Sequence, residues 1–151
     1  MSDEFNLYKR NLPHWRNNNA IYFVTWRLHK AQAPLTGEER TIVVSALKYF
    51  NGNRYAIIAY VVMDDHVHVL VRPTGGYLLS QILHSWKSFS VRQLQKDGER
   101  ERMIWQDESF DRIVRDEKEL LEIIKYIAGN PASRWPDITV YLWGQVLEDW
   151  D

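Results

Sequence analysis

The amino-acid sequence predicts an α+β fold in which helices pack on an antiparallel sheet, and two observations carry this prediction. Residues 55–72 contain two apolar runs that flank Asp64 and Asp65, as expected for antiparallel strands joined by a tight turn. Segments with apolar residues at helical spacing lie before and after this hairpin, at about 36–50 and 78–96. Helices on either side of an antiparallel hairpin are typical of α+β proteins.

A strand and a helix are expected before the hairpin. The polar segment 1–19, which we expect to be irregular, contains basic and aromatic residues: Lys9, Arg10, His14, Trp15 and Arg16. Residues 21–29 are rich in aromatic and β-branched side chains, which favour a strand. Thr36 and Glu39 form a capping-box pattern, which predicts a helix that starts there and runs to about Phe50.

After the second helix the sequence predicts two short strands and a third helix. The strand candidates are residues 103–106 and 111–115. Asp116 can cap the third helix, which we expect to end near Asn130, because Pro131 disfavours helical geometry in the residue before it. The resulting order, β-α-β-β-α-β followed by a helix, predicts a ferredoxin-like sandwich with an antiparallel sheet and helices on one face.

Composition indicates one soluble globular domain over residues 1–151, and the tail from Ser133 on shows no clear period. The hydrophobic content is 45% and the charged content 26%. Without a cysteine, the chain has no disulfide, thiolate metal site or cysteine nucleophile. No apolar run approaches the ~20 residues of a membrane span, and the N-terminus does not resemble a signal peptide, so we expect a cytoplasmic protein without membrane contact.

The charge is unevenly distributed, although the net charge is only −1. The acidic residues are concentrated after residue 96, and none lies between His66 and Lys96. A nearly neutral protein can still present one positive face to nucleic acid, although a solvated charge asymmetry would give the same pattern. Three basic residues within this acid-free segment are candidates for contacts with DNA phosphates: Arg72, Lys87 and Arg92.

Two histidines open the second strand of the hairpin. Because side chains alternate along a strand, His66 and His68 share one face, about 7 Å apart, while Val67 points to the other. Two imidazoles on one face can chelate a metal ion. Two partly buried, hydrogen-bonded histidines are the structural alternative.

The third helix carries a polar side that could complete a site. At 100° per residue, Tyr126 and Asn130 share one side, one turn apart. The expected buried stripe lies elsewhere on the helix: Leu120, Ile123, Ile124, Ile127 and Ala128. If this side of the helix packs beside the histidines, Asn130 can become a third metal ligand and Tyr126 a nucleophile next to the ion. Otherwise Tyr126 is a surface tyrosine.

The sequence resembles the REP-associated tyrosine transposases, a branch of the single-tyrosine HUH transposases, in which two histidines flank a hydrophobic residue. The similar segments keep the order and spacing of that family and lie at residues 21–27, 61–70, 82–88, 105–106, 109–116 and 126–131. The His-x-His element alone is unspecific, but its combination with Tyr126-x-x-x-Asn130-Pro131 is quite specific. Together these segments indicate a single HUH transposase-like domain with a core at about 20–132, and the tail at 133–151 matches the family poorly.

The resemblance implies a DNA transposase that nicks and rejoins single-stranded DNA next to hairpins through a 5′-phosphotyrosine intermediate. It implies His66 and His68 as the HUH pair, Tyr126 as the catalytic nucleophile, and Asn130 as the polar residue completing a site for Mg²⁺ or Mn²⁺ on a helix near the HUH strand. The competing interpretations are a non-catalytic ferredoxin-like module that binds single-stranded nucleic acid, and a metallohydrolase with a water nucleophile. The sequence leaves open the DNA sequence, whether the protein is a monomer or a homodimer, and whether Tyr126 acts in its own subunit.

Overall fold

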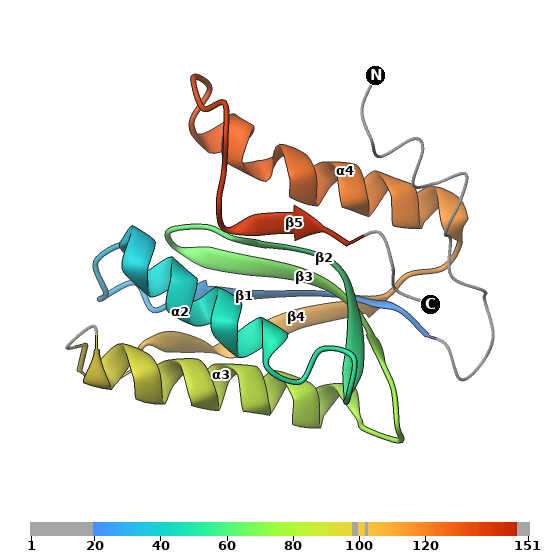
Figure 1. Cartoon of the computed structure of the whole chain (residues 1–151), viewed down its shortest axis with the longest axis horizontal. Helices are drawn as coiled ribbons and strands as arrows, with labels where there is room; N and C mark the ends of the chain where they lie inside the picture. The colour runs from blue at the N-terminus through green and yellow to red at the C-terminus, as the bar shows by residue number, and fades with distance from the viewer. Residues whose placement is uncertain (1–19, 98–99, 102, 148–151) are drawn as a thin grey trace.

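The computed structural model describes residues 20–97, 100–101 and 103–147, and the basic-aromatic cluster at Lys9–Arg16 lies outside them. Within these residues the centre is a five-stranded antiparallel sheet with the order β4-β1-β3-β2-β5 (Figure 1). The strands are β1 (Tyr22–Leu28), β2 (Tyr55–Val62), β3 (His66–Pro73), β4 (Trp105–Ile113) and β5 (Gly144–Val146). The order 4-1-3-2 of the first four strands confirms the ferredoxin-like sandwich.

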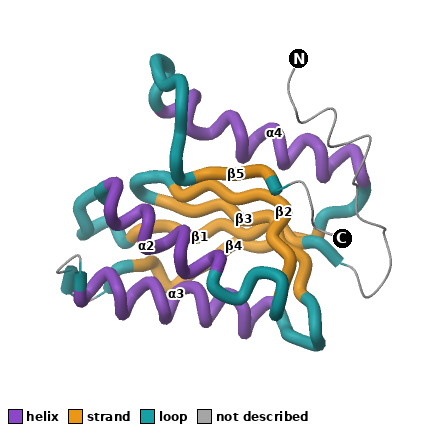
Figure 2. Tube along the Cα trace, viewed as in Figure 1, coloured by secondary structure: helices purple, strands orange, loops and turns teal. Residues whose placement is uncertain are grey.

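Helices cover both faces of the sheet, as Figures 1 and 2 show. Helices α2 (Gly37–Lys48) and α3 (Leu79–Lys96) lie side by side on one face, and α4 (Glu117–Arg134) lies on the other. The capping box predicted for α2 is present, with Thr36 and Glu39 satisfying each other's backbone N–H groups. The prediction of helices on one face therefore holds for α2 and α3, while the third helix has a face of its own.

Strand β3 separates two environments because its side chains alternate. Val67, Val69 and Val71 are fully buried in the core under α2 and α3. His66, His68 and Leu70 point to the face that α4 partly covers, where Leu70 packs with the apolar residues of α4. The predicted division of the strand is confirmed. It follows from the two-residue period of an extended chain.

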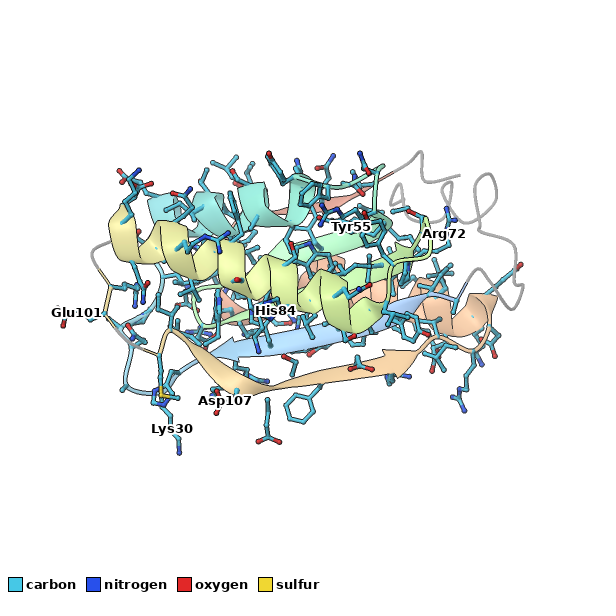
Figure 3. The ribbon with its side chains drawn as sticks, turned by 90° about the horizontal axis from the view of Figure 1, so that it is seen from below. Lys30, Tyr55, Arg72, His84, Glu101 and Asp107 are labelled. Carbon is cyan, nitrogen blue, oxygen red and sulfur yellow. The ribbon has the colours of Figure 1, made fainter. Side chains whose placement is uncertain are left out.

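Aromatic residues fill the core between the sheet and the helices α2 and α3, the face toward the viewer in Figure 3. Trp26 and Trp86 stack with ring centroids 5.8 Å apart, and both are buried as the sequence suggested. Two polar groups of this core are paired: Trp86 Nε1 donates to Tyr55 Oη at 2.8 Å, and this hydroxyl donates to the Leu47 carbonyl at 2.6 Å. These two bonds tie α3 to α2 through β2.

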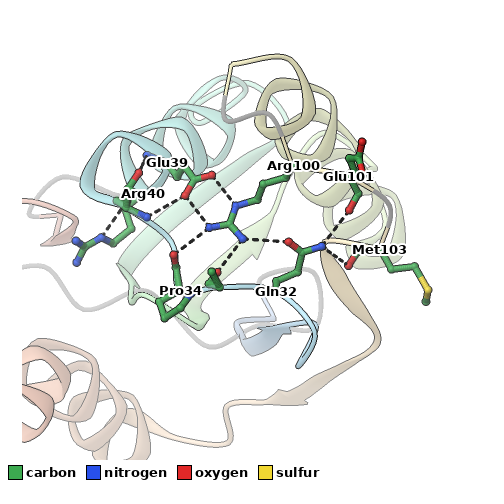
Figure 4. A network of polar contacts seen from close by, with 9 residues as sticks. Gln32, Pro34, Glu39, Arg40, Arg100, Glu101 and Met103 are labelled. Atoms are coloured by element: carbon green, nitrogen blue, oxygen red, sulfur yellow. Dashed lines mark hydrogen bonds and ion pairs between the residues drawn. The ribbon is translucent and has the colours of Figure 1, made fainter.

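A buried ion pair between Arg100 and Glu39 holds the segment that follows β1 (Figure 4). Arg100 contacts both carboxylate oxygens of Glu39, at 2.6 and 2.8 Å, and donates to the carbonyls of Ala33 and Pro34. Glu39 is only 5% exposed, and its hydrogen bonds to Arg100 hold its pKa below the ordinary value although burial opposes this. The bidentate pair locks the segment after α3 onto the start of α2.

The structure differs from the sequence-based prediction in three elements. The two short strands predicted between 103 and 115 are one strand, β4, which pairs with β1 across the polar residues Asp107 and Glu108. Helix α4 continues past Asn130 to Arg134, with Pro131 buried inside it. The tail adds β5, which pairs with β2 at the sheet edge. None of the helices in the described ranges is long and apolar enough to cross a membrane.

Candidate active site

Helix α4 packs on the sheet through its apolar stripe and leaves its polar side beside β3. Leu120, Ile123, Ile124 and Ile127 are buried as predicted, whereas Ala128, at the margin of the stripe, is exposed. Tyr126 lies off the stripe and is 55% exposed. The helix thus places its last turns, with Tyr126 and Asn130, next to the start of β3.

His66 is held by polar groups at both ring nitrogens. Its Nδ1 lies 2.7 Å from Oδ1 of Asp65, and its Nε2 lies 3.1 Å from Oδ1 of Asn130 on α4. Burial disfavours the charged form of Asp65, but its hydrogen bond to His66 and the charges of His66, Arg134 and Arg27 hold its pKa below the ordinary value. The carboxylate of Asp65 therefore orients the His66 ring toward Asn130.

His68 is almost entirely buried, with 4% of its surface exposed. Its Nδ1 lies 2.7 Å from the hydroxyl of Thr25 on β1. Its Nε2 is buried, and no hydrogen-bond partner for it exists in the described part of the chain. Burial, reinforced by electrostatic interactions with His66 and Arg27, lowers the pKa of His68 to about 3, so this imidazole is neutral at physiological pH.

The ring of Tyr126 completes the cluster. It meets the ring of His68 with centroids 5.3 Å apart, and the rings of His66 and His68 are themselves 4.7 Å apart. Phe23 of β1 supports this arrangement, since its ring contacts both His68 and Tyr126, at 5.4 and 6.3 Å. One chain therefore brings together all four residues that the sequence singled out: His66, His68, Tyr126 and Asn130.

The side chains present fit a divalent metal ion. In both histidines Nδ1 faces an oxygen, from Asp65 or Thr25, and a proton on Nδ1 would leave the lone pair of Nε2 for a metal ion. The buried Nε2 of His68, unpaired within the described residues, is the atom that such an ion would satisfy. The described residues contain no cluster of three His, Cys, Asp or Glu side chains, and the amide oxygen of Asn130 is the polar atom found beside Nε2 of His66.

An ion-pair clamp fixes the end of α4 to the β2–β3 turn. Arg134, in the last turn of α4, lies 3.1 Å from Oδ2 of Asp64 and 3.5 Å from Oδ1 of Asp65. Asp65 also contacts His66. The clamp therefore couples the position of Asn130, one turn earlier on the helix, to the orientation of His66.

The three candidate phosphate-binding residues lie apart from this cluster. Lys87 and Arg92 are on α3, on the opposite face of the sheet. The ammonium of Lys87 donates to the Gln106 carbonyl at 3.1 Å and to Ser109 Oγ at 2.8 Å, and burial lowers its pKa although Asp107 opposes this shift. Arg72 shares the site face of β3 but lies six residues beyond His66, at the end of the sheet opposite Lys30 (Figure 3).

Sequence reasoning missed four residues around the cluster: Phe23, Thr25, Asp65 and Arg134. Thr25 and Phe23 alternate on β1, and β1 pairs directly with β3, so that Thr25 is the cross-strand neighbour of His68. The sheet order of the ferredoxin-like fold, applied to the predicted strands, would have found these two. The partners of Arg134 depend on the helix passing Pro131.

Comparison with known structures supports the fold. The structure of a REP-associated tyrosine transposase bound to a REP hairpin matches with a TM-score of 0.66 and 20% sequence identity, over 83% of this chain and 74% of the other. A protein from Deinococcus radiodurans R1, described as a transposase, matches with a TM-score of 0.56 and 17% identity, over 78% of this chain and 97% of the other. No curated protein sequence matches the chain significantly.

The sequence itself places the protein in a family. The model of the IS200-like transposases matches residues 17–130, which include both histidines, Tyr126 and Asn130. The chain belongs to the IS200-like transposase family.

Proposed function

We propose that the protein cleaves and rejoins single-stranded DNA next to hairpins through a covalent 5′-phosphotyrosine intermediate on Tyr126. The observation that carries this proposal is the contact of an exposed tyrosine ring with a buried, neutral histidine, at a centroid distance of 5.3 Å. A tyrosine with more than half of its surface exposed is accessible to a DNA strand, and its position off the apolar stripe leaves the phenol free of a packing role.

The reaction is a transesterification in which the phenolic oxygen of Tyr126 forms a bond to the scissile phosphorus. The bond from phosphorus to the 3′ oxygen breaks, and that oxygen leaves as a 3′-hydroxyl after taking up a proton. The aryl phosphodiester retains the energy of the broken bond, so a 3′-hydroxyl can later attack it and restore a DNA strand. A nucleophile on a helix anchored by four buried apolar residues is held in one orientation for both steps.

His66, His68 and Asn130 would hold a divalent cation. When bound, Mg²⁺ or Mn²⁺ supplies positive charge that polarises the scissile phosphate and stabilises the charge developing on it. Imidazole ligands by affinity favour Zn²⁺ or Cu²⁺, so cellular availability is the argument for Mg²⁺ or Mn²⁺. Asp65 and Thr25 keep both imidazoles oriented for this role.

Hairpin DNA is the proposed partner, by analogy with the structural neighbour that is bound to a REP hairpin. Contacts of Arg72, Lys87 and Arg92 with DNA phosphates stay a prediction. Arg92 is exposed on α3, whereas the ammonium of Lys87 is already engaged with β4. The proposal therefore depends on Tyr126 and the histidines rather than on these three residues.

The decisive experiment is a gel assay for covalent protein–DNA adducts. The purified chain is incubated with a labelled, hairpin-bearing single strand and Mn²⁺ or Mg²⁺, and we expect a Tyr126-linked adduct together with a free 3′-hydroxyl. Tyr126→Phe should bind the DNA and form neither product. Tyr49→Phe is the matched control, because Tyr49 is 69% exposed at the end of α2 on the other side of the sheet.

Each competing function predicts a different result in this assay. A non-catalytic binding module would bind the strand without any cleavage. A metallohydrolase would cleave it without an adduct, and Tyr126→Phe would cut at the wild-type rate. Either result would refute the phosphotyrosine mechanism.

A further inference from the structure

Within the described residues, the sheet face that carries the histidines is covered by a helix mainly over β2, β3 and β5. Helix α4 packs on β2, β3 and β5, while β1 and β4 extend beyond it (Figure 1). By register, five side chains of β1 and β4 belong to this open half-face: Phe23, Thr25, Arg27, Phe110 and Arg112. They begin directly beside His66 and His68, since Arg27 and Thr25 are their cross-strand neighbours.

Phe110 is the unusual member of the open half-face, because its ring is 59% exposed in the middle of an edge strand. Natural edge strands generally avoid exposed apolar side chains, which invite aggregation. Phe110 stands opposite Thr25, and Thr25 stands opposite His68, so the three residues form one rung across β4, β1 and β3. With strands ~4.8 Å apart, the backbone of Phe110 lies about 10 Å from that of His68.

The charges on the open half-face suit a nucleic acid. Arg27 is exposed next to His66, and its charge reaches the site, since it contributes to the pKa shifts of His68 and Asp65. Arg112 lies over the ring of Phe23, 5.8 Å from its centroid, and is paired with Glu119 of α4 at 2.7 Å. The open half-face therefore combines an exposed aromatic ring with the exposed cation Arg27, and cations and aromatic rings together bind unpaired strands.

We propose that Phe110 is a stacking platform for an unpaired base close to the scissile phosphate, with Arg27 contacting the DNA backbone between Phe110 and the histidines. This inference rests on the proposed function, because it takes single-stranded DNA as the substrate. The single-stranded DNA then crosses the sheet from the His66 end of β3 over β1 to β4. Every base has a π-face, so the platform adds affinity without sequence preference.

Base stacking can be measured without cleavage, in full-length protein that carries Tyr126→Phe. The probe is a hairpin-bearing DNA strand with 2-aminopurine placed in turn at each unpaired position of its flank. We expect the protein to quench the fluorescence at one or two adjacent positions. Adding Phe110→Ala should abolish this quenching and weaken binding about tenfold, which corresponds to about 1.4 kcal/mol for one base–aromatic stack. Phe110→Trp should retain both.

Ile113→Ala is the matched control, since Ile113 is 52% exposed on the same strand but pairs with Tyr22 and belongs to the opposite face. It should quench and bind like the parent. The platform is refuted if Phe110→Ala does the same, or if its main effect is to change the mass of the protein in sedimentation, because Phe110 then contacts a second copy. If removal of residues 1–19 increases the quenching, that segment covers Phe110 in the full-length protein, and the platform is also refuted.

These outcomes are separable from a failure of the proposed function. If Phe110→Ala binds DNA and forms the adduct as the wild type does, the stacking role of Phe110 is refuted while the phosphotyrosine mechanism stands. If the quenching depends on Phe110 but the wild-type protein never forms a Tyr126 adduct, the stacking role is supported and the phosphotyrosine mechanism is refuted.

Discussion

The hydroxyl of Thr25 lies 2.7 Å from Nδ1 of His68, so a residue on β1 determines the orientation of an imidazole on β3. Thr25→Val keeps the branched shape but leaves the buried Nδ1 without a partner. We expect it to lower the free energy of unfolding by about 1–3 kcal/mol and cleavage by about 10–100-fold. Denaturant titration and the adduct assay measure the two effects.

Thr25→Ser is the control for this change, because it retains the hydroxyl and should keep most of the activity. If Thr25→Val cleaves DNA as fast as Thr25→Ser does, the hydrogen bond has no part in positioning His68.

Metal removal provides a second prediction. Treatment with a chelator should stop adduct formation, and added Mg²⁺ or Mn²⁺ should restore it. The proposed ligands His68 and Asn130 carry no charge, so without the ion they cannot supply the positive charge that the scissile phosphate needs. His66→Ala and Asn130→Ala should not be restored at the same metal concentration. Hairpin binding, followed by fluorescence anisotropy, should change little, since phosphate and base contacts dominate affinity. Full activity of the wild type in chelator would contradict a metal role.

The clamp between Arg134 and the β2–β3 turn leads to a third prediction. Because its side chain is 42% exposed, Arg134→Ala should cost less than about 1 kcal/mol of stability. Cleavage should nevertheless fall severalfold, because the helix turn that carries Asn130 is less firmly held against His66. Arg115→Ala, which removes an exposed ion pair at the other end of α4, should cost similar stability without loss of activity. Equal activity losses in both variants would argue against a specific role of the clamp.

The fourth prediction concerns pH and Glu119. Hydrogen bonds from Arg112 and from the backbone N–H of Arg115 lower the pKa of Glu119 from its ordinary 4.5 to about 2. Folding favours the ionised carboxylate of Glu119. The contribution of this carboxylate to the stability of the folded protein is therefore complete above about pH 4.5 and is lost as the pH falls to about 2.

Comparison with Glu119→Gln tests this sign. The wild type should be more stable at pH 7 by at most about 1 kcal/mol, since Arg112 and Arg115 are solvent-exposed partners, and the difference should vanish near pH 2. Exposed Glu122, changed to Gln, should give a difference that does not follow this pH course. A gap between wild type and Glu119→Gln that grows on acidification would contradict the assignment.

The sequence was informative where a local period or cap determines structure. Alternation in β3 predicted which side each of His66 and Val67 faces, and the helical period predicted that Tyr126 lies off the buried stripe. The partner of His68 could not be read from neighbouring residues, because Thr25 is 43 positions away and reaches it through sheet pairing.

The elements that were misjudged depend on tertiary contacts. Strand β4 contains Asp107 and Glu108, which lie between the two short strands that the sequence predicts, and pairing with β1 on either side of them makes one strand. Pro131 was expected to end α4, yet it lies inside the helix and is buried, and Arg134 gains partners in the β2–β3 turn. Strand β5 has three residues, too few for any period, and is specified by pairing with β2.

The short connection between β4 and α4 has a consequence for how copies of the protein cooperate. Only residues 114–116 separate the two elements, and Val114 is buried and bonded to the Ile21 carbonyl, so there is little slack for α4 to reach the sheet of a neighbour. A mixture of inactive His66→Ala and Tyr126→Phe proteins should therefore not complement. Specific activity on DNA should likewise be unaffected by dilution, with every molecule acting as a complete and independent enzyme.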